Sequence, residues 1–98
     1  MKVAYVFLTQ ERRNFNARTK WYRIPEIDWV YIDGDFDRER PQLKELMNLV
    51  RPGDTIFIEE LGDVADSADE LLAFLQELQR RKLKIVIERV PVELLIEK

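Results

Sequence analysis

The sequence predicts a single α/β domain, spanning residues 1–98, in which a mainly parallel four-stranded sheet carries helices on its faces in three layers. Short apolar runs rich in β-forming residues alternate along the chain with longer segments of helical periodicity. Because a helix between two strands carries the chain back across the sheet, this order favours parallel pairing. The 98 residues also fit one domain with one modest core.

Four short apolar runs are predicted to form the strands. The first begins almost at the N-terminus, the second surrounds Trp29, and the other two each follow a predicted helix. Their lengths and their apolar character are typical of buried strands. In chain order the runs are Val3–Leu8, Ile27–Ile32, Thr55–Ile58 and Leu83–Ile87.

A first helix is predicted to begin at Pro41, because proline suits a first helical turn, where its missing N–H would have no partner. The segment ends at a turn that contains Pro52 and Gly53. Between these points the apolar residues recur at i, i+3, i+4 and i+7, which gives the helix one face for the sheet. They are Leu43, Leu46, Met47 and Val50.

A second helix is predicted from a capping box, in which Ser67 accepts a bond from a first-turn amide and Glu70 reaches back. Basic residues at 80–82 complement the negative end of its dipole. Its apolar side consists of Leu71, Leu72, Phe74, Leu75 and Leu78. Residues 10–24, by contrast, have no clean apolar face, so the pattern gives little support for a helix between the first two strands.

The composition excludes several kinds of chemistry. The chain has no cysteine and no histidine, so disulfides, thiolate metal sites and the usual general base are absent, and we expect no cofactor and no metal. No apolar run approaches the roughly 20 residues that span a bilayer, and no signal-peptide pattern opens the chain, so we predict a cytoplasmic protein. High Glu, Lys and Arg with few Asn and Gln is typical of many hyperthermophile proteins.

The net charge of −3 conceals two segments of opposite sign. Residues 52–79 carry acids and no base, so this part should repel a polyanion. Residues 12–23 carry bases and no acid, interleaved with aromatic rings, a pattern that can neutralise and stack on a nucleic acid. Because the acidic segment opposes it, we expect any such binding to be weak. The candidate nucleic-acid-binding residues are Arg12, Arg13, Arg18, Lys20 and Arg23.

Several short motifs follow one another in order along residues 1–89. They are Tyr5-Val6-Phe7-Leu8-Thr9, Asp33, Arg40-Pro41-Gln42-Leu43, Gly53-Asp54 and Leu61-Gly62-Asp63-Val64-Ala65-Asp66. In this order the chain resembles the N-terminal catalytic domain of the serine recombinases, the resolvases and invertases. The resemblance implies the fold of that catalytic domain and a connection with DNA recombination.

The departures from the family's pattern decide the functional prediction. In the family, a serine attacks a DNA phosphate and forms a phosphoserine link, and several arginines stabilise the developing charge. Here the serine position is Thr9, the first-strand arginine is Phe7, Arg40 is kept, and two later arginines are Asp63 and Asp66. Phosphoryl transfer depends mainly on positioning and positive charge, and one lost group typically costs about 10²–10³ in rate. The resemblance therefore implies a truncated, degenerate domain with no catalytic residues.

The leading hypothesis is a catalytically inactive resolvase-like domain that acts through protein contacts, as a homodimer or as a modulator of an intact recombinase. The apolar tail at 90–98 favours it, because exposed apolar residues on a small domain promote self-association. One alternative is a nucleic-acid-binding accessory protein that uses the basic segment 12–23. No membrane partner is expected.

A second alternative is a carboxylate-based phosphoesterase that binds Mg²⁺ at Asp33, Asp63 and Asp66, at the carboxyl ends of the strands. Acids alternate from Asp33 to Asp37 as in a calcium loop. An EF-hand is nevertheless excluded, because Arg38 stands where it needs glycine and Lys44 where it needs glutamate.

Overall fold

The computed structural model describes residues 1–9 and 26–88, and from the second strand onward strands and helices alternate as predicted. The strands are β1 (Lys2–Leu8), β2 (Trp29–Gly34), β3 (Thr55–Ile58) and β4 (Lys84–Ile87). The helices are α2 (Pro41–Leu49) and α3 (Ala68–Arg80), with a short 3₁₀ turn, η3 (Leu61–Asp63), between β3 and α3. The segment 10–24, where a helix had little support, and the apolar tail lie outside the described residues.

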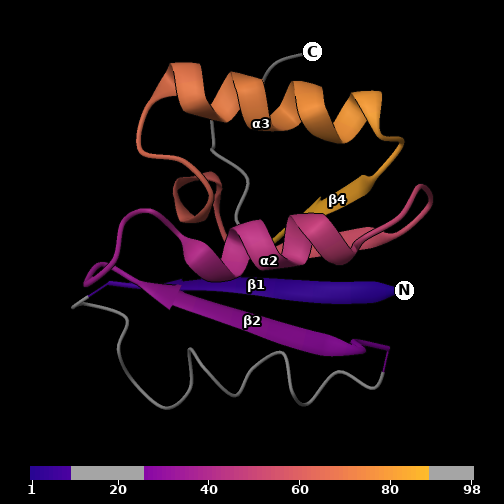
Figure 1. Ribbon diagram of the computed structural model, residues 1–98, viewed down its shortest axis with the longest axis horizontal. Coiled ribbons are helices and arrows are strands. Elements are labelled where there is room, and N and C mark those ends of the chain that lie inside the picture. Colours follow the sequence, from indigo (N-terminus) through magenta and orange to yellow (C-terminus); the bar gives the residue numbers. More distant parts are fainter. Residues whose placement is uncertain (10–25, 89–98) are drawn as a thin grey trace.

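The four strands form one parallel sheet in the order β2-β1-β3-β4 (Figure 1). β1 is central: Ala4 is paired with Val30 on one side and with Phe57 on the other. The predicted α/β class and the parallel four-stranded sheet are thereby confirmed. No helix in the described part of the chain is long and apolar enough to cross a membrane.

The main core lies between the sheet and the two described helices, which pack on the same face (Figure 1). Alternate residues of β1 point into it, because successive side chains of a strand face opposite sides of the sheet. Val3, Tyr5 and Phe7 are all buried there, against Leu46 of α2, which is fully buried, and Leu78 of α3. A smaller cluster on the opposite face contains Ala4, Val6 and Val30.

The start of α3 has the predicted capping box. The Ser67 hydroxyl accepts a hydrogen bond from the Glu70 amide at 3.2 Å, and the Glu70 carboxylate accepts one from the Asp66 amide at 2.8 Å. The Glu70 amide is one that the helix itself cannot pair, and the bond from Asp66 holds the residue before the cap in place. The local sequence of 66–70 is therefore sufficient to start this helix.

Candidate functional site

The chain reverses its direction across the sheet between β1 and β3. From β1 it moves to β2 on one side, and α2 then carries it back past β1 to β3 on the other side. In open parallel sheets, ligands bind in the crevice that such a reversal leaves at the carboxyl ends of the strands. The end of β1, the residue before α2 and the η3 turn come together at this crevice, around the side chain of Arg40.

Arg40 is a strained and buried residue. Its backbone lies in the left-handed region, at φ 53° and ψ 60°, and the residue is only 6% exposed. That conformation costs roughly 1–2 kcal/mol for a residue with a Cβ. The guanidinium donates from Nε to the Asp63 carbonyl at 2.9 Å and from Nη2 to the Gly62 carbonyl at 3.3 Å. These bonds tie the start of α2 to η3.

The same guanidinium forms a two-pronged ion pair with Asp66. Nη1 donates to Oδ2 at 3.1 Å and Nη2 to Oδ1 at 3.0 Å, while Arg38 donates to Oδ1 at 2.8 Å. The hydrogen bond from Arg40 lowers the pKa of Asp66, helped by the charges of Arg40 and Arg38. Burial opposes the charged form of Arg40, but the bond and charge of Asp66 outweigh it and raise the pKa of Arg40. Both groups are therefore ionised and neutralise each other.

Phe7 supplies an aromatic face beneath the two cations. The central carbon of the Arg40 guanidinium lies 4.4 Å from the ring centroid, and that of Arg38 lies at 5.5 Å. A cation over a ring at this distance is attracted by the negative face of the π-system. Phe7, one of the positions singled out by the family resemblance, thus supports Arg40 and Arg38 with an aromatic ring.

Asp33 is buried at the end of β2 and provides the cap that α2 lacks locally. Its carboxylate accepts bonds from the amides of Gln42 at 3.1 Å and Leu43 at 3.0 Å, and from the Tyr5 hydroxyl at 2.8 Å. A carboxylate at a helix N-terminus also interacts favourably with the helix dipole. Burial, followed by the bond to Asp33, raises the pKa of Tyr5, so this phenol stays protonated as a donor.

The structure gathers most of the residues singled out from the sequence. Phe7, Arg40, Asp63 and Asp66 lie in one cluster, and Asp63 is buried at the end of η3. Thr9 follows the end of β1 and is half-buried. The basic residues of segment 12–23 lie outside the described residues.

Two of the three acids named for the magnesium alternative, Asp33 and Asp66, make hydrogen bonds within the domain. Asp33 uses its oxygens for the amides of α2 and the Tyr5 hydroxyl, and Asp66 uses its own for two arginines. Within residues 1–9 and 26–88, no group of three acidic side chains is placed to hold a metal ion. The carboxylates of Asp33 and Asp66 therefore serve helix capping and ion pairing, respectively.

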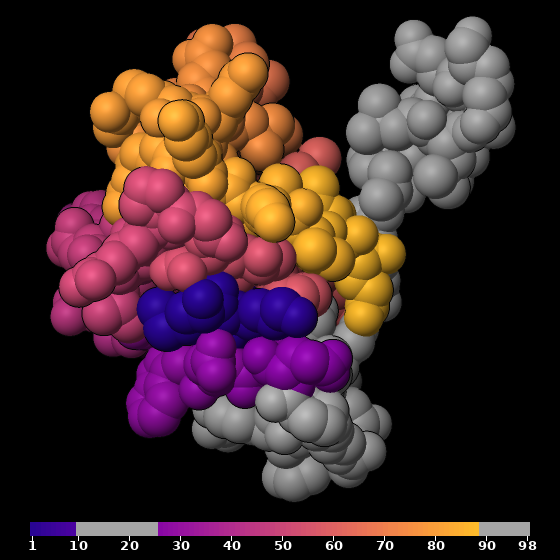
Figure 2. All heavy atoms as spheres, turned by 90° about the vertical axis from the view of Figure 1, so that its right-hand side faces the viewer, coloured from indigo at the N-terminus to yellow at the C-terminus, as the bar shows by residue number. Residues whose placement is uncertain are grey.

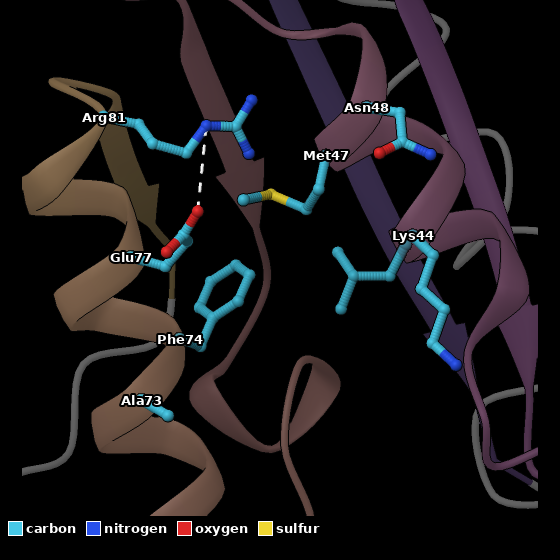
Figure 3. A pocket seen from close by; sticks show the side chains of 8 residues that line it. Lys44, Met47, Asn48, Ala73, Phe74, Glu77 and Arg81 are labelled. Atoms are coloured by element: carbon cyan, nitrogen blue, oxygen red, sulfur yellow. Dashed lines mark ion pairs between the residues drawn. The ribbon is translucent and has the colours of Figure 1, made fainter.

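A second hollow, of about 460 Å³, lies between α2 and α3 (Figure 3). Leu43, Met47 and Phe74 give it an apolar floor. At its rim Arg81 lies 3.9 Å from the Glu77 carboxylate and donates to the Val50 carbonyl at 3.2 Å. This hollow is a seam between two helices whose rim arginine is already bonded within the domain.

Comparison with known proteins agrees with this geometry. Residues 30–93 match the model of the resolvase N-terminal domain. The chain belongs to this resolvase family. The Tn501 resolvase of Pseudomonas aeruginosa and the Tn1721 resolvase of Escherichia coli are each 37% identical to it over 84 residues, 86% of its length. Those residues are 45% of each relative, so this resolvase domain spans less than half the length of the curated resolvases it matches.

Three residues of the cluster around Arg40 have roles that the sequence did not predict. Arg38 shares Asp66 with Arg40, Asp33 caps α2, and Tyr5 bonds Asp33. The alternation Arg38, Glu39, Arg40 before a proline could have indicated a paired guanidinium site. Nothing in the local sequence indicates the roles of Asp33 and Tyr5. These two residues are 28 positions apart, and Asp33 also joins a strand to a helix.

Proposed function

We propose that this resolvase-family domain neither cleaves nor joins DNA and that it acts through contacts with protein. The single observation that carries the proposal is the state of Arg40. It is the one arginine kept at the family-equivalent positions, and its guanidinium is taken up by Asp66, two backbone carbonyls and the Phe7 ring.

A DNA phosphate would have to compete with Asp66 for Arg40. The carboxylate is already seated in a two-pronged geometry and is held by Arg38 as well. Bringing a phosphate beside that carboxylate adds like-charge repulsion, which is strongest where water is excluded. The charge that would stabilise a phosphoryl-transfer transition state is thus already neutralised before any substrate arrives.

The nucleophile position gives no compensation. Thr9 has a hydroxyl, but its β-branched side chain is stiffer than that of serine. A hydroxyl is a poor nucleophile at its ordinary pKa and needs a neighbouring base. With Phe7, Asp63 and Asp66 at the arginine positions, the charge around it has also been changed from positive to neutral or negative.

The test is a cleavage assay on supercoiled plasmid that carries a recombination site of an intact transposon resolvase. We expect no nicked, linear or exchanged product, and no covalent protein–DNA adduct on a denaturing gel. The Tn501 resolvase on its own site serves as the positive control. An adduct formed by this chain and abolished in Thr9→Ala would refute the proposal.

A second variant, Asp66→Asn, tests whether the charge of Asp66 keeps an anion away from Arg40. In Asp66→Asn the neutral amide leaves Arg40 without its counter-ion but keeps a similar shape. If Asp66 is what blocks the anion site, inorganic phosphate should raise the melting temperature of Asp66→Asn and leave the parent chain unchanged, since a ligand stabilises the state that binds it. Equal phosphate effects on both proteins would contradict the role given to Asp66.

The second half of the proposal is that the domain acts by binding protein. The domain would pair with a second copy of itself or bind an intact recombinase as a modulator. Several large apolar side chains of the described part are exposed, among them Leu49 and Leu72 on the helices. Such side chains gain roughly 1.5–3 kcal/mol each when they are fully buried, so an association that covers them is favoured.

A further inference from the structure

The two ends of the sheet differ in charge. All four strands run in one direction and both described helices run back, so the strand starts and the helix ends lie at one edge (Figure 1). Figure 2 faces this edge, hereafter the amino edge. Its strands begin at Lys2, Trp29, Thr55 and Lys84.

The opposite edge of the sheet is acidic. Asp33 ends β2, Glu59 and Glu88 follow β3 and β4, and Asp63 and Asp66 belong to the crevice of the candidate site. A surface of one charge sign repels a ligand of the same sign. A polyanion is therefore disfavoured at the crevice and favoured at the amino edge.

Four exposed cations of the amino edge have no ion pair among residues 1–9 and 26–88. They are Lys2, Arg51, Lys82 and Lys84. Two acids of this edge are engaged within the domain. Asp54 accepts from the Met1 ammonium at 2.7 Å, and Asp28 accepts from the Lys2 amide at 2.8 Å. The four side-chain charges are thus available to a ligand.

Main-chain bonds bring these cations together around the turn before β3. The Gly53 amide in this turn donates to the Lys82 carbonyl at 2.8 Å. Lys2 and Lys84 both pair with Thr55, one from either side. Their backbones are therefore two strand spacings, about 10 Å, apart. The cations form one patch on a rigid part of the fold.

Lys82 occupies a position for which glycine is better suited. Its backbone is left-handed, at φ 60°, and helices commonly end with glycine in this conformation. Its charge is not needed at the end of α3, because Arg80 is paired with Glu77 there and Arg81 donates to a carbonyl at the end of α2. Arg40 is the other described residue with a side chain and this backbone, and it too is a cation. This pattern favours a ligand for the Lys82 ammonium group.

An exposed aromatic ring lies at the same edge. Trp29 is 63% exposed and pairs with Val3, the residue after Lys2. Unpaired bases stack on such rings, while lysine and arginine side chains contact the phosphates of the same strand. In a duplex the bases are already stacked on each other, so an aromatic ring beside a basic patch fits a single strand better.

We propose that the amino edge binds single-stranded nucleic acid, with its phosphates at the four cations and one base on Trp29. From β2 to β4 this edge extends over three strand spacings, about 14 Å, which suits a short stretch of a strand. Because the cations meet only the backbone, the binding has little sequence preference. This site goes beyond the proposed function and lies opposite the crevice of Arg40.

Fluorescence anisotropy of a labelled oligothymidylate of about 12 nucleotides, within the usual range of site sizes, tests the proposal. Four phosphate contacts predict that log affinity falls with log salt at a slope of about −3, since each contact on a single strand contributes about 0.7. Lys84→Gln should weaken binding about 3-fold and reduce the steepness by about 0.7. Lys44→Gln is the matched control, because Lys44 is also exposed and has no ion pair in the described part but lies on α2. It should bind like the parent chain.

Trp29→Ala tests the stacked base. It should weaken binding about 5-fold or more and leave the salt slope unchanged, because stacking releases no counterion. Trp21→Phe leaves Trp29 as the one tryptophan of the chain, and its fluorescence should fall as the oligonucleotide is added. Circular dichroism checks that each variant is folded.

Several outcomes would overturn the inference. Absence of saturable binding at low salt excludes the site. An equal loss in Lys44→Gln, or a loss confined to Arg18→Gln/Lys20→Gln, assigns binding to another surface. A duplex of the same length that binds more tightly, or Trp29→Ala without effect, rejects the single strand and its stacked base. Polyglutamate that competes equally, charge for charge, identifies an acidic polypeptide as the ligand instead. Binding at this edge uses neither Thr9 nor Arg40, so the cleavage assay and this assay fail separately.

Discussion

The two described helices begin in opposite ways. α3 begins at a capping box whose three residues, Asp66, Ser67 and Glu70, lie within five positions of the sequence. α2 begins at Arg40, which has no capping side chain of its own and a left-handed backbone. Its free amides are bonded by Asp33 at the end of β2, which in turn is bonded by Tyr5 from β1.

The difference shows which of the two helix starts depends on the rest of the fold. At α3, local sequence and helix start agree, as is usual for an element with only a structural role. At α2, a strained backbone aims Arg40 into the crevice between β1 and β3, and the sheet must supply the cap. Strain of this kind clusters at functional sites. The scaffold that positions Arg40 is thus built across the sheet, and the contacts that hold its guanidinium in the crevice come from Asp66 and the Phe7 ring.

Removing the remote cap should be the most costly change. Asp33→Ala leaves the amides of Gln42 and Leu43 and the hydroxyl of Tyr5 without their acceptor in a buried place. Lost caps and unsatisfied buried donors together should lower the free energy of unfolding by about 2–4 kcal/mol. Urea denaturation followed by circular dichroism measures this directly.

Asp33→Asn is the matched control for that prediction. The amide oxygen still accepts, but the NH₂ that replaces the second carboxylate oxygen is a donor, so it cannot accept the hydrogen bonds made on its side of the group. The loss should be roughly half of that in Asp33→Ala. If Asp33→Ala costs less than 1 kcal/mol, the remote cap does not hold α2, and the contrast between the two helices is lost.

The features that the sequence predicted are those set by local signals, as at α3, and the features it did not predict depend on distant residues, as at α2. The four strands, both helices and the capping box were predicted, because periodicity, Pro41, Ser67 and Glu70 are local signals. The cluster was predicted only as a set of positions from the family resemblance. Its actual bonds were not predicted, since Asp33 meets α2 and Asp66 meets Arg40 only after the sheet has formed.

The pair between Arg40 and Asp66 should give the next largest effect and a defined pH dependence. Asp66→Asn removes the counter-ion of a buried guanidinium, but Arg40 keeps two carbonyl partners and Asp66 is 36% exposed, so water screens the pair. We therefore expect a loss of about 1–2 kcal/mol at pH 7.

The pH dependence follows from the lowered pKa of Asp66. A carboxyl group whose pKa is lower in the folded than in the unfolded protein stabilises the fold above its unfolded value, near pH 4, and loses that contribution as the pH falls further. The stability difference between the parent and Asp66→Asn should therefore be constant from about pH 5 to pH 8 and shrink toward pH 3. A difference that persists unchanged at pH 3 would show that the variant acts through lost shape rather than lost charge.

The local cap of α3 should give the smallest effect. Ser67→Ala removes one acceptor from the Glu70 amide at the exposed start of the helix, where water can replace it. The expected loss in the free energy of unfolding is about 1 kcal/mol, and Ser67→Asp, which keeps an acceptor at this position, should lose much less. Because Ser67 and Asp33 share no bonded partner, the losses in Ser67→Ala and Asp33→Ala should add to within about 0.5 kcal/mol in the double variant. A clearly smaller combined loss would mean that the two helix starts are coupled through Asp66, which is bonded by Arg40 on one side and whose amide is bonded by Glu70 on the other.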